Sequence, residues 1–289
     1  MNRIQVWTLA ARPKTLVAGI APVLIGTTLA LCQGRFNLSI FLFTLLTALG
    51  IQIGTNLAND YFDFIKGADT AERKGFTRMT QAGFVTPAAM KRAMITTFAI
   101  TLLSGGYLIW HGGALIAILL SLSVALGVLY TGGPFPLAYL GLGEFFVLFF
   151  FGPIAVLGTY FLQTGTYCLE AFIAGLSPGA LSMAILIVNN VRDIEEDKKA
   201  NKKTLAVRFG KIFGRCEFLF AILLSLIPPA LFFSTHPFSC LTLLILLPAI
   251  PLMRAMVTNE DPKLLNSLFS KTAQIQWLFT LLFCIGWML

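Results

Sequence analysis

Nine apolar segments, each long enough to cross a bilayer, dominate this chain of 289 residues. A spanning helix needs about 20 mostly apolar residues, and hydrocarbon offers no water to an unpaired backbone, so such segments must be helical. We predict spanning helices at roughly residues 14–33, 38–60, 87–109, 113–131, 141–162, 168–190, 213–234, 238–257 and 271–289. Most connections between them are short. The sequence therefore predicts an all-α, polytopic membrane protein with a single domain over residues 1–289.

The basic residues indicate how these segments are oriented. If the N-terminus lies in the cytoplasm and the segments alternate, 20 of the 21 Lys and Arg residues fall on the cytoplasmic side, and Arg35 alone falls outside. Cytoplasmic loops of membrane proteins carry such an excess. We therefore expect a multi-pass protein of the bacterial cytoplasmic (inner) membrane. The net charge of +8 fits this topology and an anionic substrate rather than nucleic acid, and no protein partner can be inferred.

Two acidic clusters lie at the ends of predicted helices and hold eight of the thirteen carboxylates. The first acidic cluster comprises Asn56, Asn59, Asp60 and Asp63, followed by Asp69 and Glu72. The second acidic cluster comprises Asn189, Asn190, Arg192, Asp193, Glu195, Glu196 and Asp197. In each cluster, amides and acids recur at three- and four-residue spacing, so they share one face of a helix. Carboxylates stacked in this way repel one another unless a cation lies between them.

The chemistry of these clusters points to a hard cation. Carboxylate and amide oxygens suit Mg²⁺, which proteins usually hold with one or two carboxylates together with substrate phosphates. Each cluster also opens into a basic loop, with Arg73, Lys74 and Arg78 after the first and Lys198, Lys199, Lys202 and Lys203 after the second. Two acidic faces beside basic loops therefore indicate a site that binds a diphosphate through Mg²⁺.

The clusters also form a weak internal repeat. Each ends a helix that runs from outside to inside, and each contains Asn–x–x–x–Asp, from Asn59 to Asp63 and from Asn189 to Asp193. Such a duplication would place both sites at the same end of a bundle, facing a central cavity that opens to lipid and is capped on the cytoplasmic side. The link 131–140, rich in Gly and Pro and flanked by Tyr130 and Tyr139, cannot be helical throughout. We interpret it as either an ordinary tight turn or a shaped loop beside the site.

These residues resemble the motifs of the UbiA-type intramembrane prenyltransferases. The segment from Asn56 to Asp69 is similar to the first motif of that superfamily, and the segment from Asn189 to Gly210 is similar to the second. Within it, the chain most resembles the 1,4-dihydroxy-2-naphthoate polyprenyltransferase branch of menaquinone synthesis. Three features carry this resemblance: Asp69 lies six residues after Asp63, the segment 78–83 follows, and the link to the fifth helix carries Gly-Gly-Pro and Gly-x-Gly-Glu. Phe76 departs from the branch, which usually has Gly-Pro before the Arg.

The resemblance implies an Mg²⁺-dependent enzyme that transfers a polyprenyl group from polyprenyl diphosphate to 1,4-dihydroxy-2-naphthoate, releasing CO₂ and diphosphate and giving demethylmenaquinone. The residues it implies for metal binding are Asn59, Asp63, Asp69, Asn189, Asp193 and Asp197. The carboxylates it implies for catalysis are Asp60, Asp63, Asp193 and Asp197. The residues expected to bind substrate are Arg78, Lys202, Lys203, Arg12, Lys14, Tyr130 and Tyr139, with Arg12 and Lys14 holding the acceptor carboxylate. The rings of the Phe-rich stretch 145–151 could line the corridor for the prenyl tail.

Two alternatives remain open from the sequence. One is a UbiA-type enzyme for another aromatic acceptor, such as 4-hydroxybenzoate or a plastoquinone precursor. The other is an ion-coupled transporter, since carboxylates at membrane depth often mark ion paths. A transporter would place its acids near mid-helix on several spans, whereas these acids lie at helix ends on one side.

Overall fold

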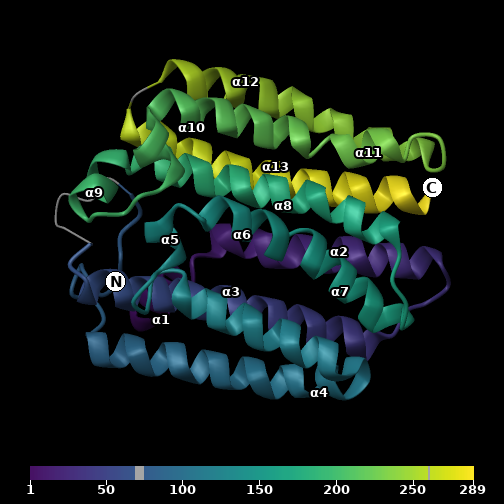
Figure 1. Ribbon diagram of the computed structural model, residues 1–289, viewed down its shortest axis with the longest axis horizontal. Coiled ribbons are helices and arrows are strands. Elements are labelled where there is room, and N and C mark those ends of the chain that lie inside the picture. The colour runs from purple at the N-terminus through teal and green to yellow at the C-terminus, as the bar shows by residue number, and fades with distance from the viewer. Residues whose placement is uncertain (69–74, 260) are drawn as a thin grey trace.

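The computed structural model describes residues 1–68, 75–259 and 261–289, which form a bundle of helices (Figure 1). In chain order the elements are α1 (Arg3–Ala11), the 3₁₀ helix η1 (Pro13–Thr15), α2 (Leu16–Cys32), α3 (Leu38–Ile65), α4 (Pro87–Leu129), α5 (Leu137–Leu140), α6 (Gly143–Phe150), α7 (Pro153–Thr164), α8 (Leu169–Arg192), α9 (Ile194–Lys199), α10 (Leu205–Leu224), α11 (Ile227–Leu231), the 3₁₀ helix η2 (Pro237–Ile245), α12 (Leu246–Thr258) and α13 (Pro262–Met288).

Eight helical stretches in the described part of the chain are long and apolar enough to cross a membrane. One of them, α4, has 43 residues, which at 1.5 Å per residue would be about twice the hydrocarbon thickness. Gly113 breaks it with a φ of 67°, a backbone conformation that glycine adopts readily. The two halves then pack against each other, with Gly105 of the first against Leu120 of the second. This pair matches the separate spans predicted at 87–109 and 113–131.

The starts of two helices differ from the predicted bounds. Helix α10 starts at Leu205, but Gly210 breaks it with a φ of 86°, so the stretch after the break begins close to the predicted residue 213. The last helix, α13, starts at Pro262 rather than near residue 271, and its first turns carry polar residues, which made them resemble a loop. In α13 the polar side chains face inward: Asn266 accepts a hydrogen bond from Arg192, and Ser270 accepts one from Lys14. Their polarity therefore reflects contact with other polar groups of the protein.

Helix α8 forms the centre of the bundle, and α4 lies at its edge. In their most apolar windows, 78% of the α8 residues are buried inside the protein, against 17% for α4, so α4 exposes its surface to lipid. Gly175 and Gly179 let α8 approach the junction of α6 and α7, where a Cβ on Gly175 would lie 2.5 Å from the Cα atom of Pro153. Small residues allow this close approach between membrane helices. The contact fixes the second acidic cluster, at the end of α8, relative to α6.

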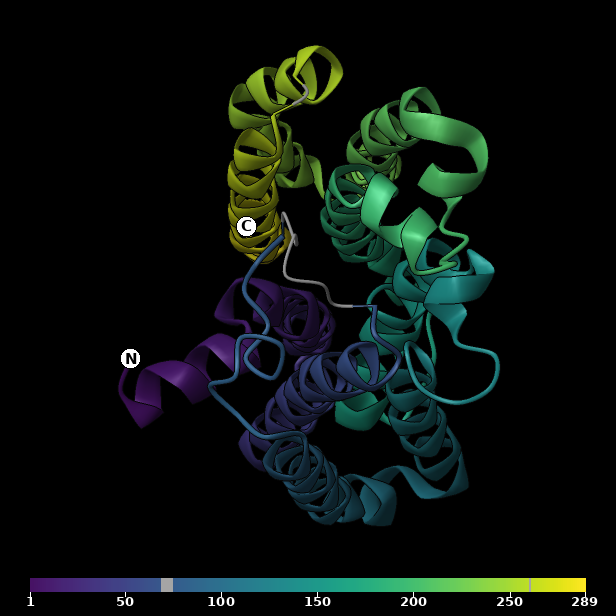
Figure 2. The ribbon, with the colours of Figure 1, turned by 90° about the vertical axis from the view of Figure 1, so that its left-hand side faces the viewer.

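Helices α3 and α8 run in the same direction and end on the same side of the bundle, at the left of Figure 1. We call this side the motif end, and Figure 2 views it directly. The N-terminal helix α1 and the short helix α9 also lie there, whereas the C-terminus lies at the opposite end (Figure 1). Both acidic clusters therefore come to one end of the bundle, as the repeat predicts.

Candidate active site

The first part of the first acidic cluster, Asn56 to Asp63, occupies the last three turns of α3, and its polar side chains are buried, whereas Asp69 and Glu72 lie outside the described residues. Asn59, Asp60 and Asp63 have exposed fractions of 8%, 2% and 1%. Asn59 Oδ1 accepts a hydrogen bond of 2.9 Å from Thr131 in the link that follows α4. Charged groups at such depth need partners, so the contacts of the two acids indicate their roles.

Asp60, for which a catalytic role was expected, contacts a loop of the protein itself. Its two carboxylate oxygens accept hydrogen bonds from the backbone N–H groups of Met79 and Thr80, at 2.9 and 3.1 Å. Asp60 therefore anchors the loop that carries Arg78. In the same way, the amide of Asn56 donates to Ala11 O and to Thr15 Oγ1, which ties the start of the chain to α3.

Asp63 joins the two clusters through cations of the protein itself. Its Oδ2 lies 3.2 Å from Arg78 Nη2, and its Oδ1 lies 3.1 Å from Lys202 Nζ. The same Lys202 ammonium lies 3.9 Å from Asp197 Oδ1 of the second cluster. One ammonium thus links carboxylates that are more than 130 residues apart in sequence. The repulsion expected along the acidic face is offset here by these basic side chains.

In the second acidic cluster, Asp193 is paired with the arginine that precedes it in sequence. Arg192 donates two hydrogen bonds of 2.6 Å, from Nε and Nη2, to the carboxylate of the neighbouring Asp193. Its Nη2 also donates to Asn189 Oδ1, and its Nη1 donates to Asn266 Oδ1 on α13 at 2.7 Å. A bidentate arginine–carboxylate pair of this kind is strong and directional. Arg192 therefore holds two of the predicted metal ligands in place.

Of the basic residues expected at the site, Arg78 and Lys202 reach the carboxylates directly. The side chain of Lys203 is exposed. Its backbone N–H donates a hydrogen bond of 3.2 Å to Tyr139 O. Arg12 donates to the backbone oxygen of Asn56 at 3.3 Å. Lys14 is exposed, donates to Ser270 at 2.8 Å and lies over the Phe76 ring. The expected residues Asp69, Arg73 and Lys74 lie outside the described residues.

Tyr139 and Tyr130 both lie beside the clusters. The Tyr139 ring faces two ammonium groups, with Lys66 Nζ 4.9 Å and Lys202 Nζ 5.4 Å from its centroid. Burial lowers the pKa of Lys66, while the charge of Asp63 opposes that shift. Burial raises the pKa of the Tyr130 phenol, and the carboxylates of Glu144, Asp197 and Asp63 add to the rise. Tyr130 is therefore a neutral phenol surrounded by acids.

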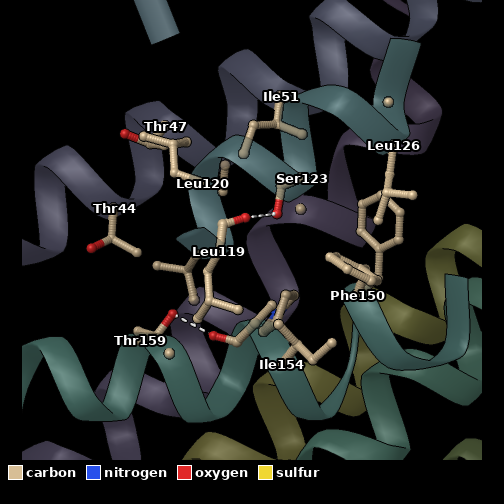
Figure 3. A pocket seen from close by; sticks show the side chains of 18 of the residues that line it. Thr44, Thr47, Ile51, Leu119, Leu120, Ser123, Leu126, Phe150, Ile154 and Thr159 are labelled. Carbon is tan, nitrogen blue, oxygen red and sulfur yellow. Dashed lines mark hydrogen bonds between the residues drawn. The ribbon is translucent and has the colours of Figure 1, made fainter. Parts of the chain in front are cut away.

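An apolar cavity of about 200 Å³ extends from Tyr130 into the bundle between α2, α3, α4, α6 and α7 (Figure 3). Its walls include Phe146, Phe150 and Phe151, so part of the Phe-rich stretch lines a corridor as the sequence predicts. Two hydroxyl groups in the wall bond to their own helices, Ser123 to Leu119 O and Thr159 to Ala155 O, and Thr47 bonds to Ser104 of α4. The wall thus remains apolar, and its residues come from both ends of the spans.

The side chains at the motif end have the donor chemistry that Mg²⁺ requires. Asn59, Asp63, Asn189, Asp193 and Asp197 offer oxygen atoms, and Asp63 and Asp197 already converge on one cation, Lys202. Among the described residues, no three acidic, Cys or His side chains form a ready metal site. The carboxylates are paired with Arg and Lys instead. The residues fit the ion by type, provided that these cations give way to it.

Four contacts at the site were missed in the sequence. Thr131 binds Asn59, Lys66 packs on Tyr139, Asn266 binds Arg192, and Phe76 lies between Lys14 and Arg192. Thr131 and Asn266 carry no charge or spacing that would mark them. Phe76 was noted only as a departure from a family pattern, and its position over two cations could not have been anticipated from that.

The chain is similar in sequence to known proteins along almost its whole length. Residues 19–288 match the UbiA prenyltransferase family. The chain is 37% identical over 295 residues to the 1,4-dihydroxy-2-naphthoate octaprenyltransferase of Escherichia coli, which covers 99% of this chain and 96% of that protein. The protein of the same name in Haemophilus influenzae is 34% identical over 298 residues, with the same coverage.

Solved structures share the fold. The apo structure of a UbiA homologue from Aeropyrum pernix superposes with a TM-score of 0.72 at 13% identity and covers 95% of this chain and 98% of that one. A UbiA homologue from Archaeoglobus fulgidus, bound to DMAPP and Mg²⁺, has a TM-score of 0.62 at 15% identity, with coverages of 96% and 98%. At these identities the likeness is one of fold.

Proposed function

The chain belongs to the UbiA prenyltransferase family, and on that basis we propose that it transfers a polyprenyl group from polyprenyl diphosphate to 1,4-dihydroxy-2-naphthoate. The products are demethylmenaquinol, which is the reduced form of demethylmenaquinone, together with CO₂ and diphosphate. The main support within the structure is that carboxylates of both clusters meet one ammonium, that of Lys202, near the Tyr130 end of the apolar cavity. Relatives at 34–39% identity that bear the name of this activity support the choice of acceptor.

The two parts of this arrangement suit the two parts of the donor substrate. Arg78 and Lys202 would bind the outer oxygens of the diphosphate, where charge-assisted hydrogen bonds are strongest. The cavity lined by Phe146 and Phe150 would take the apolar tail and exclude water from the reacting carbon. Tyr130 lies at the boundary between them. The reactive allylic carbon would then lie beside Tyr130, where the polar and apolar parts meet.

Mg²⁺ would be held by Asn59, Asp63, Asn189, Asp193 and Asp197, and it would supply positive charge that offsets the charge on the departing diphosphate. Asp60 positions the loop that brings Arg78 to the site. The bond between the allylic carbon and the diphosphate oxygen breaks, and the ring carbon that carries the carboxylate bonds to the allylic carbon. The carboxylate then leaves as CO₂, and its bonding electrons restore the aromatic ring.

The enzyme would work from one side of a membrane. The helical spans make the chain an integral, multi-pass membrane protein. We further infer that this is the bacterial inner membrane, with the N-terminus and the motif end in the cytoplasm, because 20 of 21 Lys and Arg residues then lie inside. Both the charged diphosphate and the acceptor would reach the site from the cytoplasm.

The test is an assay of the purified protein in lipid nanodiscs with octaprenyl diphosphate and a panel of aromatic acids. We expect prenylated product of demethylmenaquinol mass, with equal release of CO₂ and diphosphate, only with 1,4-dihydroxy-2-naphthoate and only with Mg²⁺ present. A prenylated 4-hydroxybenzoate that keeps its carboxylate would overturn the acceptor while leaving the reaction class intact. No transfer to any acceptor would overturn the proposal.

A further inference from the structure

A carboxylate that belongs to neither acidic cluster, that of Glu144, is buried beside the site. Glu144 lies in the first turn of α6, and only 3% of it is exposed. Its Oε1 accepts a hydrogen bond of 2.6 Å from Asn190 Nδ2. In the described part of the chain no Lys or Arg pairs with it. An acid within a spanning segment is costly and usually marks a functional site.

The position of Glu144 connects the acidic clusters with the apolar cavity. Its partner Asn190 lies in the second cluster, three residues before Asp193. On the other side, the neighbouring Gly143 packs on the Tyr130 hydroxyl, since a Cβ there would lie 3.0 Å from that oxygen. Tyr130 and Val147, which is three residues after Glu144 on α6, both line the cavity.

This is the region where the acceptor ring must lie. The ring carbon has to reach an allylic carbon whose diphosphate is held at the clusters and whose tail lies in the cavity. The ring of the proposed acceptor carries two hydroxyl groups. A carboxylate accepts hydrogen bonds with two oxygens, and Asn190 engages one of them, Oε1. A hydroxyl that donates to a carboxylate also releases electron density into its ring, which favours attack on a carbocation.

We propose that Glu144 accepts a hydrogen bond from a ring hydroxyl of the aromatic acceptor, with Asn190 fixing the orientation of its carboxylate. Glu144 thereby selects a hydroxylated ring and orients it toward the allylic carbon. This inference rests on the proposed prenyl transfer and adds a binding determinant for the acceptor alone. Binding of the diphosphate, which is held by other residues, should not depend on Glu144.

Glu217 provides a matched control. It is another acid within a spanning helix, on α10, and it also has a buried carboxylate oxygen, Oε2, which makes no hydrogen bond within the described residues. Glu217→Gln therefore removes a second buried acid, close enough for its charge to act on Glu144, while the Asn190 contact stays in place. We expect its Michaelis constants for both substrates to stay within about twofold of wild type.

The experiment compares E144Q, E217Q and wild type with 1,4-dihydroxy-2-naphthoate and with analogues methylated at either hydroxyl. In E144Q we expect KM for the acceptor to rise about 10- to 100-fold, the range for a hydrogen bond to a charged group. The KM for the prenyl diphosphate, and the thermal shift that the diphosphate and Mg²⁺ produce, should be unchanged. One methylated analogue should lose the same factor in wild type, with no further loss in E144Q, because the two changes remove one interaction.

The inference would be overturned if E144Q had the same KM for the acceptor as wild type. It would also be overturned if, in E144Q, methylation of either hydroxyl raised KM further by the same factor. Loss of the diphosphate-induced thermal shift would overturn it as well, because that loss would indicate a structural role. If E144Q does not fold, wild type with the methylated analogues decides, since unchanged KM values for both would exclude a hydroxyl contact. Failure of the proposed function is distinct from all of these, because wild type itself would then transfer no prenyl group to the naphthoate.

Discussion

The two acidic clusters have the same sequence pattern but are held in different ways. In the first, Asp63 is paired with Arg78 and Lys202, which come from other segments of the chain. In the second, Asp193 is paired with Arg192, its neighbour in sequence. The ion pairs of Asp63 therefore join separate segments of the chain, whereas the ion pair of Asp193 joins two consecutive residues at the end of α8.

This difference means that equivalent substitutions should have unequal effects on stability. Removing one member of a buried ion pair leaves the other charge uncompensated, which costs roughly 3–5 kcal/mol. Asp63 is 1% exposed and has two cationic partners from elsewhere, so its loss should loosen two loops as well. Loss of Asp193 should affect mainly the end of α8.

The largest expected effect is on turnover, and it should be shared by both clusters. In D63N and D193N, kcat should fall by about 10²- to 10³-fold, as expected when a group that stabilises the developing charge is lost. The melting temperature of D63N should fall further than that of D193N. Product formation and circular dichroism melting measure the two effects. Equal melting temperatures would contradict the contrast between the clusters.

Lys202 should be the most important lysine, because it is the contact between the clusters. We expect K202M to lower kcat/KM for the prenyl diphosphate by about 10²-fold, the scale of a lost charge-assisted contact. Lys198 is the control, because it is exposed and pairs at the surface with Glu195, at 3.0 Å. K198M should stay within about twofold of wild type. Similar losses in both variants would show that the total positive charge of the loop matters, rather than the contact of Lys202 with both clusters.

Asp60→Asn tests whether this residue positions a loop. An asparagine offers one acceptor where the carboxylate offers two, so one of the N–H groups of Met79 and Thr80 loses its partner. We expect KM for the prenyl diphosphate to rise about tenfold while kcat changes less, because Arg78 is displaced. A collapse of kcat with an unchanged KM would instead indicate that Asp60 acts on the reacting groups.

The smallest effect concerns a contact between Gly75, in the loop after α3, and Arg192 of the second cluster. A Cβ on Gly75 would lie 2.6 Å from Arg192 Nη2, so G75A must shift the loop or the guanidinium. We expect a cost of about 1–2 kcal/mol in stability and a severalfold loss of activity. Gly83, where φ is +75° and no atom lies near an added Cβ, is the control for backbone strain alone. G83A should lower stability while leaving the Mg²⁺ dependence of activity unchanged.

The sequence was sufficient for much of the fold. Hydropathy located the spans, including the break at Gly113, because a bilayer leaves a chain few alternatives. The early start of α13 was missed because hydropathy cannot distinguish a loop from a helical turn whose polar side chains face a site. The short helical stretch before Gly210 in α10 was also missed, because the break at Gly210, with a φ of 86°, separates it from the apolar span that hydropathy located.

Helical spacing also predicted which oxygen-bearing residues gather, but it did not predict their partners. Asp60 shares the face of α3 with Asp63, yet its oxygens are used by the loop 78–82. The sequence places Arg192 within the second cluster, but its hydrogen bonds to Asn189 and Asp193 depend on the backbone geometry at the end of α8. Such contacts are set by the packing of segments far apart in sequence, which no local pattern records.

The central claim is that both clusters form one site for a prenyl diphosphate. The most direct test is calorimetric binding of an unreactive prenyl thiolodiphosphate, with Mg²⁺, to wild type, D63N, D193N and the double variant in nanodiscs. If the clusters act together, each single substitution removes most of the affinity and the double variant is little worse, since coupled residues are not additive. Losses that add in the double variant, or full affinity in either single variant, would show that the clusters bind independently and would contradict the account.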